Sequence, residues 1–411
     1  MLKSIIRKEI LSNLLSYKFS IIIILSTILI LVSIFVMYRD YCLALENFEI
    51  LRSKSENPPA VIPPTPLAIF AKGLEENLCR SYESGFGGSI EVSSTQKSIN
   101  KLFKLFTVPD LLYVIKVILS LCAMLFAFDI ICGEKEKGTL RQSLSCSLGR
   151  PTLIAGKWIG GFISFILPFF IAVLLGTIFV TLSPVVDMSP GNWLKLGLFL
   201  LGSVIYLAAF FSLGLLISCL THRSSTSLVL SLFVWAVLVF LVPNLGNILA
   251  RQLVPIPTVQ QLELKRKHIR VRTYIEVNRL QDWPERKKAI ERANSEREML
   301  AEDYRNRFNR LVTVSKNITQ ISPAAAFTFL ATDITGTGML EERRLKSAFL
   351  RYRDTLWNWN EKGERPAFSY QRCSAQEALG LGGLSNGVIL VLFNILFFTG
   401  AYVAFLRYDA R

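Results

Sequence analysis

The chain has 411 residues, a length that would hold two to four soluble domains, but its composition argues against a soluble protein. It is 51% hydrophobic, and its apolar residues come in blocks that carry no formal charge. The net charge of +15 gives no support for nucleic-acid binding, because Lys and Arg stand beside apolar blocks or alternate with Glu and Asp.

The first 18 residues have the pattern of an interfacial helix. Apolar residues recur at helical spacing among Lys and Arg, which favours 1–18 lying on an anionic membrane surface. The apolar run that follows, 19–38, is too long for the core of a signal peptide, and no small-x-small cleavage site comes after it. We therefore expect 19–38 to be a retained transmembrane helix.

Six apolar blocks are long enough to cross a bilayer, whose hydrocarbon core needs about 20 helical residues. The second block contains Lys116, close enough to one end for its ammonium to reach the headgroups. Because a helix satisfies its own backbone polar groups in lipid, the sequence predicts an all-α membrane protein with six transmembrane helices. The expected spans are 19–38, 109–132, 158–183, 194–220, 225–249 and 382–406.

The distribution of Lys and Arg predicts the orientation of these spans. Both residue types are concentrated in 1–18, in the connector 133–150 and after the last span. Since such residues remain in cytoplasmic loops, we expect both termini and the connector in the cytoplasm. Residues 39–108 and 251–377 then lie outside.

The two outside regions differ in character. Region 39–108 combines a charged helical start, a Pro-rich stretch and a short strand at 90–92, which predicts a small lobe. Region 251–377 contains two helix-forming segments, 262–280 and 285–314, with oppositely charged residues four apart. These segments are either a solvated helical hairpin or an arm that docks a partner outside the membrane.

The cysteines leave disulfide bonding open. Cys42, Cys79 and Cys373 fall in the expected outside regions, so one bridge with any of three pairings is allowed. The other four cysteines fall in spans or cytoplasmic segments and are expected to stay reduced.

The chain lacks the motifs of several catalytic classes. It has no G-x-x-x-x-G-K-[ST] phosphate loop, no H-E-x-x-H and no G-x-S-x-G elbow, and it has two histidines in all. We therefore expect no enzyme activity, no bound metal and no ATP hydrolysis by the chain itself. Polar residues within the spans are candidates for lining a pathway, or else have snorkelling, capping or helix-pairing roles. These pathway candidates are Lys116, Tyr206, Asn244, Asn386 and Asn394.

The connector between the second and third spans has the pattern of a short amphipathic helix. Glu134 and Glu136 fall in its expected first turn, where carboxylates complement the helix dipole. Leu140, Leu144 and Leu148 recur every four residues and would form one apolar stripe. The stripe either rests in the lipid interface or inserts into a groove of a cytoplasmic protein.

The residues of this connector carry a family resemblance. Asp129, Gly-Glu-Lys-Glu-Lys-Gly-Thr-Leu at 133–140, Ser-Leu-Gly-Arg-Pro at 147–151 and Gly156-Lys157 resemble the coupling segment of ABC type-2 permeases. The opening Arg-Lys-Glu, which ends at Glu9, resembles the same family. The large outside insertions are similar to those of permeases linked to copper-enzyme maturation and gliding motility.

The resemblance implies how such a chain would work. It would be a permease in a bacterial cytoplasmic (inner) membrane, paired with a second identical or related permease and with two ATPase subunits that bind ATP and Mg. The chain itself would hold no cofactor, and membrane lipids would surround it. The residues implied in coupling are Glu134, Glu136, Gly138, Thr139, Leu140, Leu144 and Arg150.

Two functions follow from the resemblance. The first is outward transport of an amphipathic or lipid-like substrate, which suits spans with few charges. The alternative is a mechanotransmitter, which passes ATP-driven motion through the outer helices to an extracytoplasmic partner without transport.

Overall fold

The computed structural model describes residues 2–53, 60–79, 81–84, 90–93, 109–145, 149–357 and 366–408. The chain forms two compact units. Unit 1 comprises Met1–Val239 and Pro323–Arg411, and unit 2 comprises Phe240–Ser322. Six helices in the described part of the chain are long and apolar enough to cross a membrane, which confirms the predicted all-α, six-span class. They are Tyr17–Ser53, Leu111–Glu136, Arg150–Thr181, Pro190–Leu220, Ser224–Leu253 and Ala375–Leu406.

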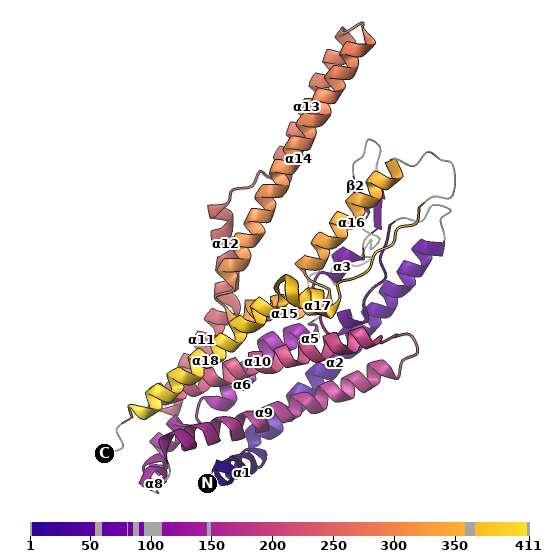
Figure 1. The fold of residues 1–411 in the computed structure, drawn as a ribbon. Coiled ribbons are helices and arrows are strands. Elements are labelled where there is room, and N and C mark those ends of the chain that lie inside the picture. Colours follow the sequence, from indigo (N-terminus) through magenta and orange to yellow (C-terminus); the bar gives the residue numbers. More distant parts are fainter. Residues whose placement is uncertain are drawn as a thin grey trace. The chain divides into compact units, whose positions relative to one another are not determined.

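In the membrane-spanning part of unit 1, α10 (Pro190–Leu220) packs against α6, α15 and α18, whereas α1 and α2 pack against α9 (Figure 1). The span of α10 is the most buried of the six, and its aromatic side chains Tyr206, Phe210 and Phe211 are fully buried. Besides α10, the helices of this part are α1 (Leu2–Leu14), α2 (Tyr17–Ser53), α5 (Leu111–Tyr113), η2 (Val114–Leu119), α6 (Ser120–Ala127), α7 (Cys132–Glu136), α8 (Thr139–Ser145), α9 (Arg150–Thr181), α11 (Ser224–Ala236), α17 (Ala375–Ala378), η4 (Leu379–Gly383) and α18 (Leu384–Leu406). The helix η3 (Val237–Leu241) begins in unit 1 and ends in unit 2.

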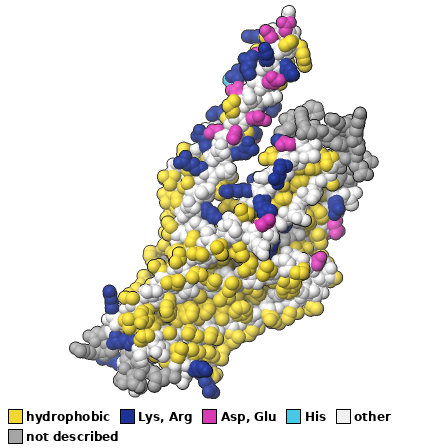
Figure 2. Space-filling view, in the orientation of Figure 1, with side chains coloured by type: hydrophobic (Ala, Val, Ile, Leu, Met, Phe, Trp, Pro, Cys, Tyr) yellow, Lys and Arg dark blue, Asp and Glu magenta, His cyan; other side chains and the backbone are white. Residues whose placement is uncertain are grey.

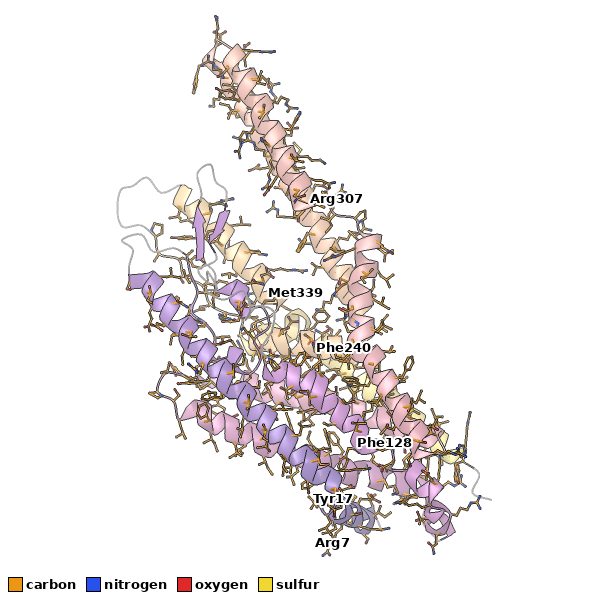
Figure 3. All side chains as sticks on the ribbon, turned by 180° about the vertical axis from the view of Figure 1, so that it is seen from behind. Arg7, Tyr17, Phe128, Phe240, Arg307 and Met339 are labelled. Carbon is orange, nitrogen blue, oxygen red and sulfur yellow. The ribbon has the colours of Figure 1, made fainter. Side chains whose placement is uncertain are left out.

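The surface of these helices suits a lipid environment. Many large apolar side chains of α2, α9, α11 and α18 are exposed, and Figure 2 shows hydrophobic side chains gathered over the spanning helices of unit 1. Both termini and α8 lie at one end of unit 1, which we call the connector end (Figure 1). Figure 3 labels Arg7, Tyr17 and Phe128 at this same end.

A small lobe lies at the opposite end of unit 1 (Figure 1). Its apolar core joins Ala60, Ile62 and Leu78 to Leu345 and Phe349, so parts of both expected outside regions pack together. The predicted strand at 90–92 is present as part of a two-stranded antiparallel hairpin in which Ser84 pairs with Ile90. The elements of the lobe and its base are η1 (Pro66–Ile69), α3 (Glu75–Leu78), β1 (Ser81–Ser84), β2 (Ile90–Ser93), α15 (Pro323–Thr335) and α16 (Met339–Trp357).

Unit 2 consists of α12 (Val242–Leu253), α13 (Val259–Arg279) and α14 (Trp283–Thr319). The last two form an antiparallel hairpin, as the sequence predicted, and each is longer than the predicted segment (Figure 1). Thr258 starts α13 with a reciprocal capping box to Gln261. The small side chains Ala289 and Ala293 are buried where the two helices meet.

The N-terminal helix packs tightly against α9, which the interfacial pattern did not predict. Gly156 and Gly160 stand four residues apart on α9, the spacing that lets two helices approach closely in a membrane. A Cβ at Gly156 would lie 2.7 Å from Ile5 Cγ2, and one at Gly160 would lie 2.7 Å from Glu9 Cβ. The structure therefore fixes α1 to the third span through these glycines.

We predict that Gly160→Ala loosens α1 without unfolding the spans. The added methyl group meets Glu9 Cβ and the Ile6 carbonyl, an overpacking that costs about 1–3 kcal/mol. Limited proteolysis of the purified protein should then cut near the N-terminus faster than in the wild type. Gly197→Ala on α10, where no atom lies within 4 Å of the new Cβ, is the matched control and should leave the cleavage rate unchanged. Equal cleavage of both variants would contradict the packing argument.

Candidate functional site

The connector between the second and third spans is two short helices, not the single helix expected over 133–150. The first, α7, ends before Gly138, whose φ of 72° lies in the left-handed region that glycine adopts without strain. The second, α8, begins at Thr139, and α9 follows from Arg150 with Pro151 in its first turn. The glycine turn lets the connector bend back toward the spans.

The connector leucines do not form the exposed stripe expected from their spacing. Leu140 is fully buried in an apolar cluster with Ile131, Ile154 and Phe405. Its side chain therefore holds α8 against the spans and is not free to enter a partner. The side chain of Leu144 and the whole of Leu148 lie outside the described residues.

The exposed surface of the connector is polar. Glu136, Lys137, Gly138, Thr139 and Arg141 are exposed and follow one another around the glycine turn. We call residues 136–141, without the buried Leu140, the connector ridge. A protein that approaches the connector end would meet this ridge, which presents backbone groups at the turn and two cationic side chains.

Lys135 and Glu136 bind the turn between α10 and α11. The Lys135 ammonium donates to the carbonyl oxygens of Cys219 and Thr221, the latter at 3.0 Å, at the C-terminal end of α10. The Glu136 carboxylate accepts from the backbone N–H of Ser224 at 3.0 Å and from its hydroxyl at 2.7 Å, at the start of α11. Each charge has the sign that complements the dipole of the helix end it binds. Glu136 therefore serves the fifth span as well as its own helix.

Glu134 belongs to a three-residue ion cluster around the buried side chain of Lys157. Lys157 Nζ lies 2.8 Å from Glu134 Oε1 and 2.9 Å from Glu9 Oε1, and the Lys157 side chain is 4% exposed. The second carboxylate oxygen of Glu134 is buried and has no hydrogen-bond partner among the described residues. The cluster joins α1, α7 and α9 at one point.

Two further contacts reach the remaining span ends. Arg150 Nη1 donates to the carbonyl oxygen of Leu406 at 2.7 Å, where α18 ends. Lys18, at the start of α2, forms an ion pair with Asp129, and its ammonium lies 4.9 Å from the centre of the Phe128 ring. The connector and the residues beside it thus contact α1 and the ends of α2, α10, α11 and α18.

The pathway candidates do not come together in one site. Tyr206 is fully buried, donates its hydroxyl to the Lys116 carbonyl at 2.7 Å and stacks on Phe327 with ring centres 4.4 Å apart. The Lys116 ammonium instead lies over the Tyr113 ring, at 5.7 Å. In these positions Tyr206 connects α10 to η2 and α15, which is a helix-pairing role.

The asparagine candidates are separate from that pair. Asn394 Oδ1 accepts a hydrogen bond from the Ser212 hydroxyl at 3.0 Å. The same hydroxyl accepts a hydrogen bond from Trp158 Nε1 at 2.9 Å. Asn386 is buried on α18, whereas Asn244 lies in unit 2 and donates to the Phe240 carbonyl at 2.9 Å.

The lobe contains a buried ion pair that no sequence pattern indicated. Both terminal nitrogens of Arg372 donate to the Glu75 carboxylate, at 2.6 and 2.9 Å, and they also donate to the carbonyl oxygens of Pro63 and Gly336. Glu75 also accepts from the backbone N–H of Thr65 at 2.8 Å. This bidentate pair ties together three segments that are far apart in the sequence.

The cysteines of the outside regions are free thiols in the structure, among the six cysteines described. Burial raises the pKa of the Cys373 thiol to about 11 and also raises the pKa of Cys79. Both thiols are therefore protonated at neutral pH and are weak nucleophiles. In the described part of the chain, no group of three His, Cys, Asp or Glu residues is placed to hold a metal ion.

Comparison with known proteins gives a family for the whole chain. Residues 4–410 match the family model described as ABC-2 family transporter protein. No curated protein matches the chain.

We predict that Lys157→Met destabilises the protein by about 3 kcal/mol, the lower end of the range for breaking a buried pair, because it leaves two partly buried carboxylates without a cation. Thermal unfolding of the detergent-purified protein would measure the loss as a lower midpoint. The triple variant Glu9→Gln/Glu134→Gln/Lys157→Met should recover most of it, since no buried charge remains. Lys137→Met, at an exposed position of the same connector, is the control and should unfold like the wild type. A triple variant as unstable as Lys157→Met would contradict the electrostatic explanation.

Proposed function

We propose that this chain, which belongs to the ABC-2 transporter family, is the permease of an ATP-driven exporter. Members of this family are multi-pass transmembrane subunits that work with ABC ATPase subunits. In our proposal two ATPases on separate chains bind ATP and Mg, and a second permease, identical or related, completes the complex. The chain itself neither hydrolyses ATP nor holds a cofactor.

One observation carries the proposal: the connector binds the ends of several spans through charged side chains. Lys135, Glu136 and Arg150 contact the ends of α10, α11 and α18, respectively. A force applied to the ridge is therefore passed to three spans through hydrogen bonds of 2.7–3.0 Å and to α1 through Lys157. Such an arrangement is what a coupling element requires.

The proposed orientation places the connector end in the cytoplasm of a bacterium. Lys and Arg are concentrated in α1, in the connector and after α18, as the positive-inside rule requires for cytoplasmic segments. Both termini lie at that end with α8 (Figure 1). The lobe, at the opposite end of unit 1, then belongs to the outside.

The proposed substrate is amphipathic or lipid-like and moves outward. The spans contain few charged side chains, and those of Lys157 and Lys195 are engaged, by carboxylates and by the Cys373 carbonyl respectively. A small ion would need a chain of polar side chains through the spans. The polar residues of the described spans instead form separate helix-pairing contacts.

We predict that the double charge reversal Lys137→Glu/Arg141→Glu separates the ATPases from the permease. Both side chains are exposed on the connector ridge, so the change should leave the unfolding midpoint unaltered. Loss of two charge contacts should weaken co-purification with the native ATPase subunits by about 10-fold or more and abolish substrate-stimulated ATP hydrolysis.

Two control variants accompany this experiment. Lys3→Glu/Lys8→Glu reverses two exposed cations on α1 at the same end and should leave the complex intact. Leu140→Asp places a charge in the apolar cluster and should lower the unfolding midpoint, which distinguishes a folding defect from a docking defect. If the ridge variant retains a fully active, transporting complex, the coupling assignment fails.

The mechanotransmitter alternative is favoured by one feature of α13. Leu264, Val271 and Ile275 are 66%, 47% and 46% exposed, and their spacing of seven and four residues forms a narrow apolar stripe opposite the buried Leu262 and Ile269. Five cations of α13 have no ion-pair partner among the described residues of the hairpin: Lys265, Arg266, Lys267, Arg270 and Arg279. An amphipathic helix with acidic flanks, carried by an extracytoplasmic partner, fits this stripe.

Replacing residues 262–314 with a short linker distinguishes the two functions. An exporter should keep substrate-stimulated ATP hydrolysis, because the spans and connector remain. A mechanotransmitter should lose the partner and its activity outside the membrane. The double variant Val271→Ser/Ile275→Ser tests the stripe alone, and Met299→Ser, at an exposed position on α14, is its control. If both variants retain the same partner equally, the stripe is not the docking surface.

A further inference from the structure

A groove of about 930 Å³ opens on unit 1 between the end of α10 and the second half of α18. Its apolar wall includes Ile395, Leu396 and Val403 of the last span, of which the first two are 57% and 63% exposed. Its cationic side chains are Lys135 and Arg407, with His222 beside them. No described residue of the lining is acidic.

The two kinds of side chain lie at different levels of the expected bilayer. Ile395 and Leu396 lie within the span Ala375–Leu406, at the level of hydrocarbon. Arg407 follows the last residue of that span, and Lys135 lies at the end of the second span, at the level of headgroups. The groove thus presents an apolar wall in the membrane and positive charge at its edge, which is the complement of an anionic phospholipid.

Of the two cations, Lys135 is held in position at the edge of the groove and Arg407 is exposed there. Lys135 is fixed by the Thr221 carbonyl at 3.0 Å and by the Tyr408 ring, whose centre lies 4.9 Å from the ammonium. Arg407 is exposed and has no ion-pair partner among the described residues, so its guanidinium is available for bidentate phosphate binding. The groove has room beside Thr399, which is exposed, and Gly400, which has no side chain.

We propose that this groove binds an anionic phospholipid, with an acyl chain along α18 and the phosphate at Arg407 and Lys135. A second copy of the chain is a poorer occupant, because a symmetric contact would bring two positive edges together. Lys135 also holds the end of α10, so the lipid would contact the connector directly. The site is independent of the proposed transport function, since binding requires no ATPase and no substrate.

The test measures lipid binding to the purified full-length permease in detergent. The probes are phosphatidylglycerol, phosphatidylcholine with the same acyl chains, and inorganic phosphate. We expect native mass spectrometry to show phosphatidylglycerol retained in preference to phosphatidylcholine, and a higher unfolding midpoint with phosphatidylglycerol alone. Arg407→Gln removes a charge-assisted contact and should weaken phosphatidylglycerol binding about 10-fold.

Two further variants make the test specific. Thr399→Trp fills the groove from an exposed position and should abolish retention of the lipid. Arg223→Gln removes an exposed cation that does not line the groove and should bind lipid like the wild type. Three results would each overturn the proposal. They are equal retention of the two lipids, an equal rise of the unfolding midpoint with inorganic phosphate, and wild-type lipid binding by Arg407→Gln and Thr399→Trp. So would a lipid-free dimer that Thr399→Trp dissociates.

Discussion

A membrane-spanning helix satisfies its backbone polar groups internally except at its ends, so the ends are where other groups can bind it strongly. In this protein one short connector supplies charged side chains to several of those ends. Lys135 binds carbonyl oxygens at the end of α10, Arg150 binds one at the end of α18, and Glu136 binds the N-terminal turn of α11. The van der Waals contacts along the lipid-facing sides of the helices have neither the direction nor the strength of these hydrogen bonds.

The Lys157 cluster extends the same principle to the N-terminal helix. Gly156 and Gly160 bring α1 close to α9, and that proximity places Glu9 within 2.9 Å of the Lys157 ammonium. Glu134 approaches the same ammonium from the connector, so a buried cation holds three helices together. Because a buried charge is costly without its partners, displacement of the connector must move α1 and α9 with it or break the cluster.

The sequence predicted features that depend on local pattern and missed those that depend on packing. The length of the uncharged apolar blocks predicted the six spans, and oppositely charged residues four apart predicted the two helices of the unit 2 hairpin. The regular spacing of the connector leucines could not show that Leu140 is covered by the protein's own spans, since periodicity identifies an apolar face but not what covers it. The pair between Arg372 and Glu75 joins residues 297 positions apart, which no local pattern reveals.

If the connector and the span ends move together, their separation should not depend on nucleotide. Double electron–electron resonance in the complete complex would measure this separation as the distance between spin labels on Ser143→Cys and Arg223→Cys. A second pair of labels, on Arg223→Cys and Lys346→Cys, would measure the distance between the two ends of unit 1. We expect ATP binding to leave the first distance unchanged and to alter the second by several ångström, about the size of known helix shifts. A change in the first distance with a constant second one would show that the connector moves without the spans, and would contradict coupling through the helix ends.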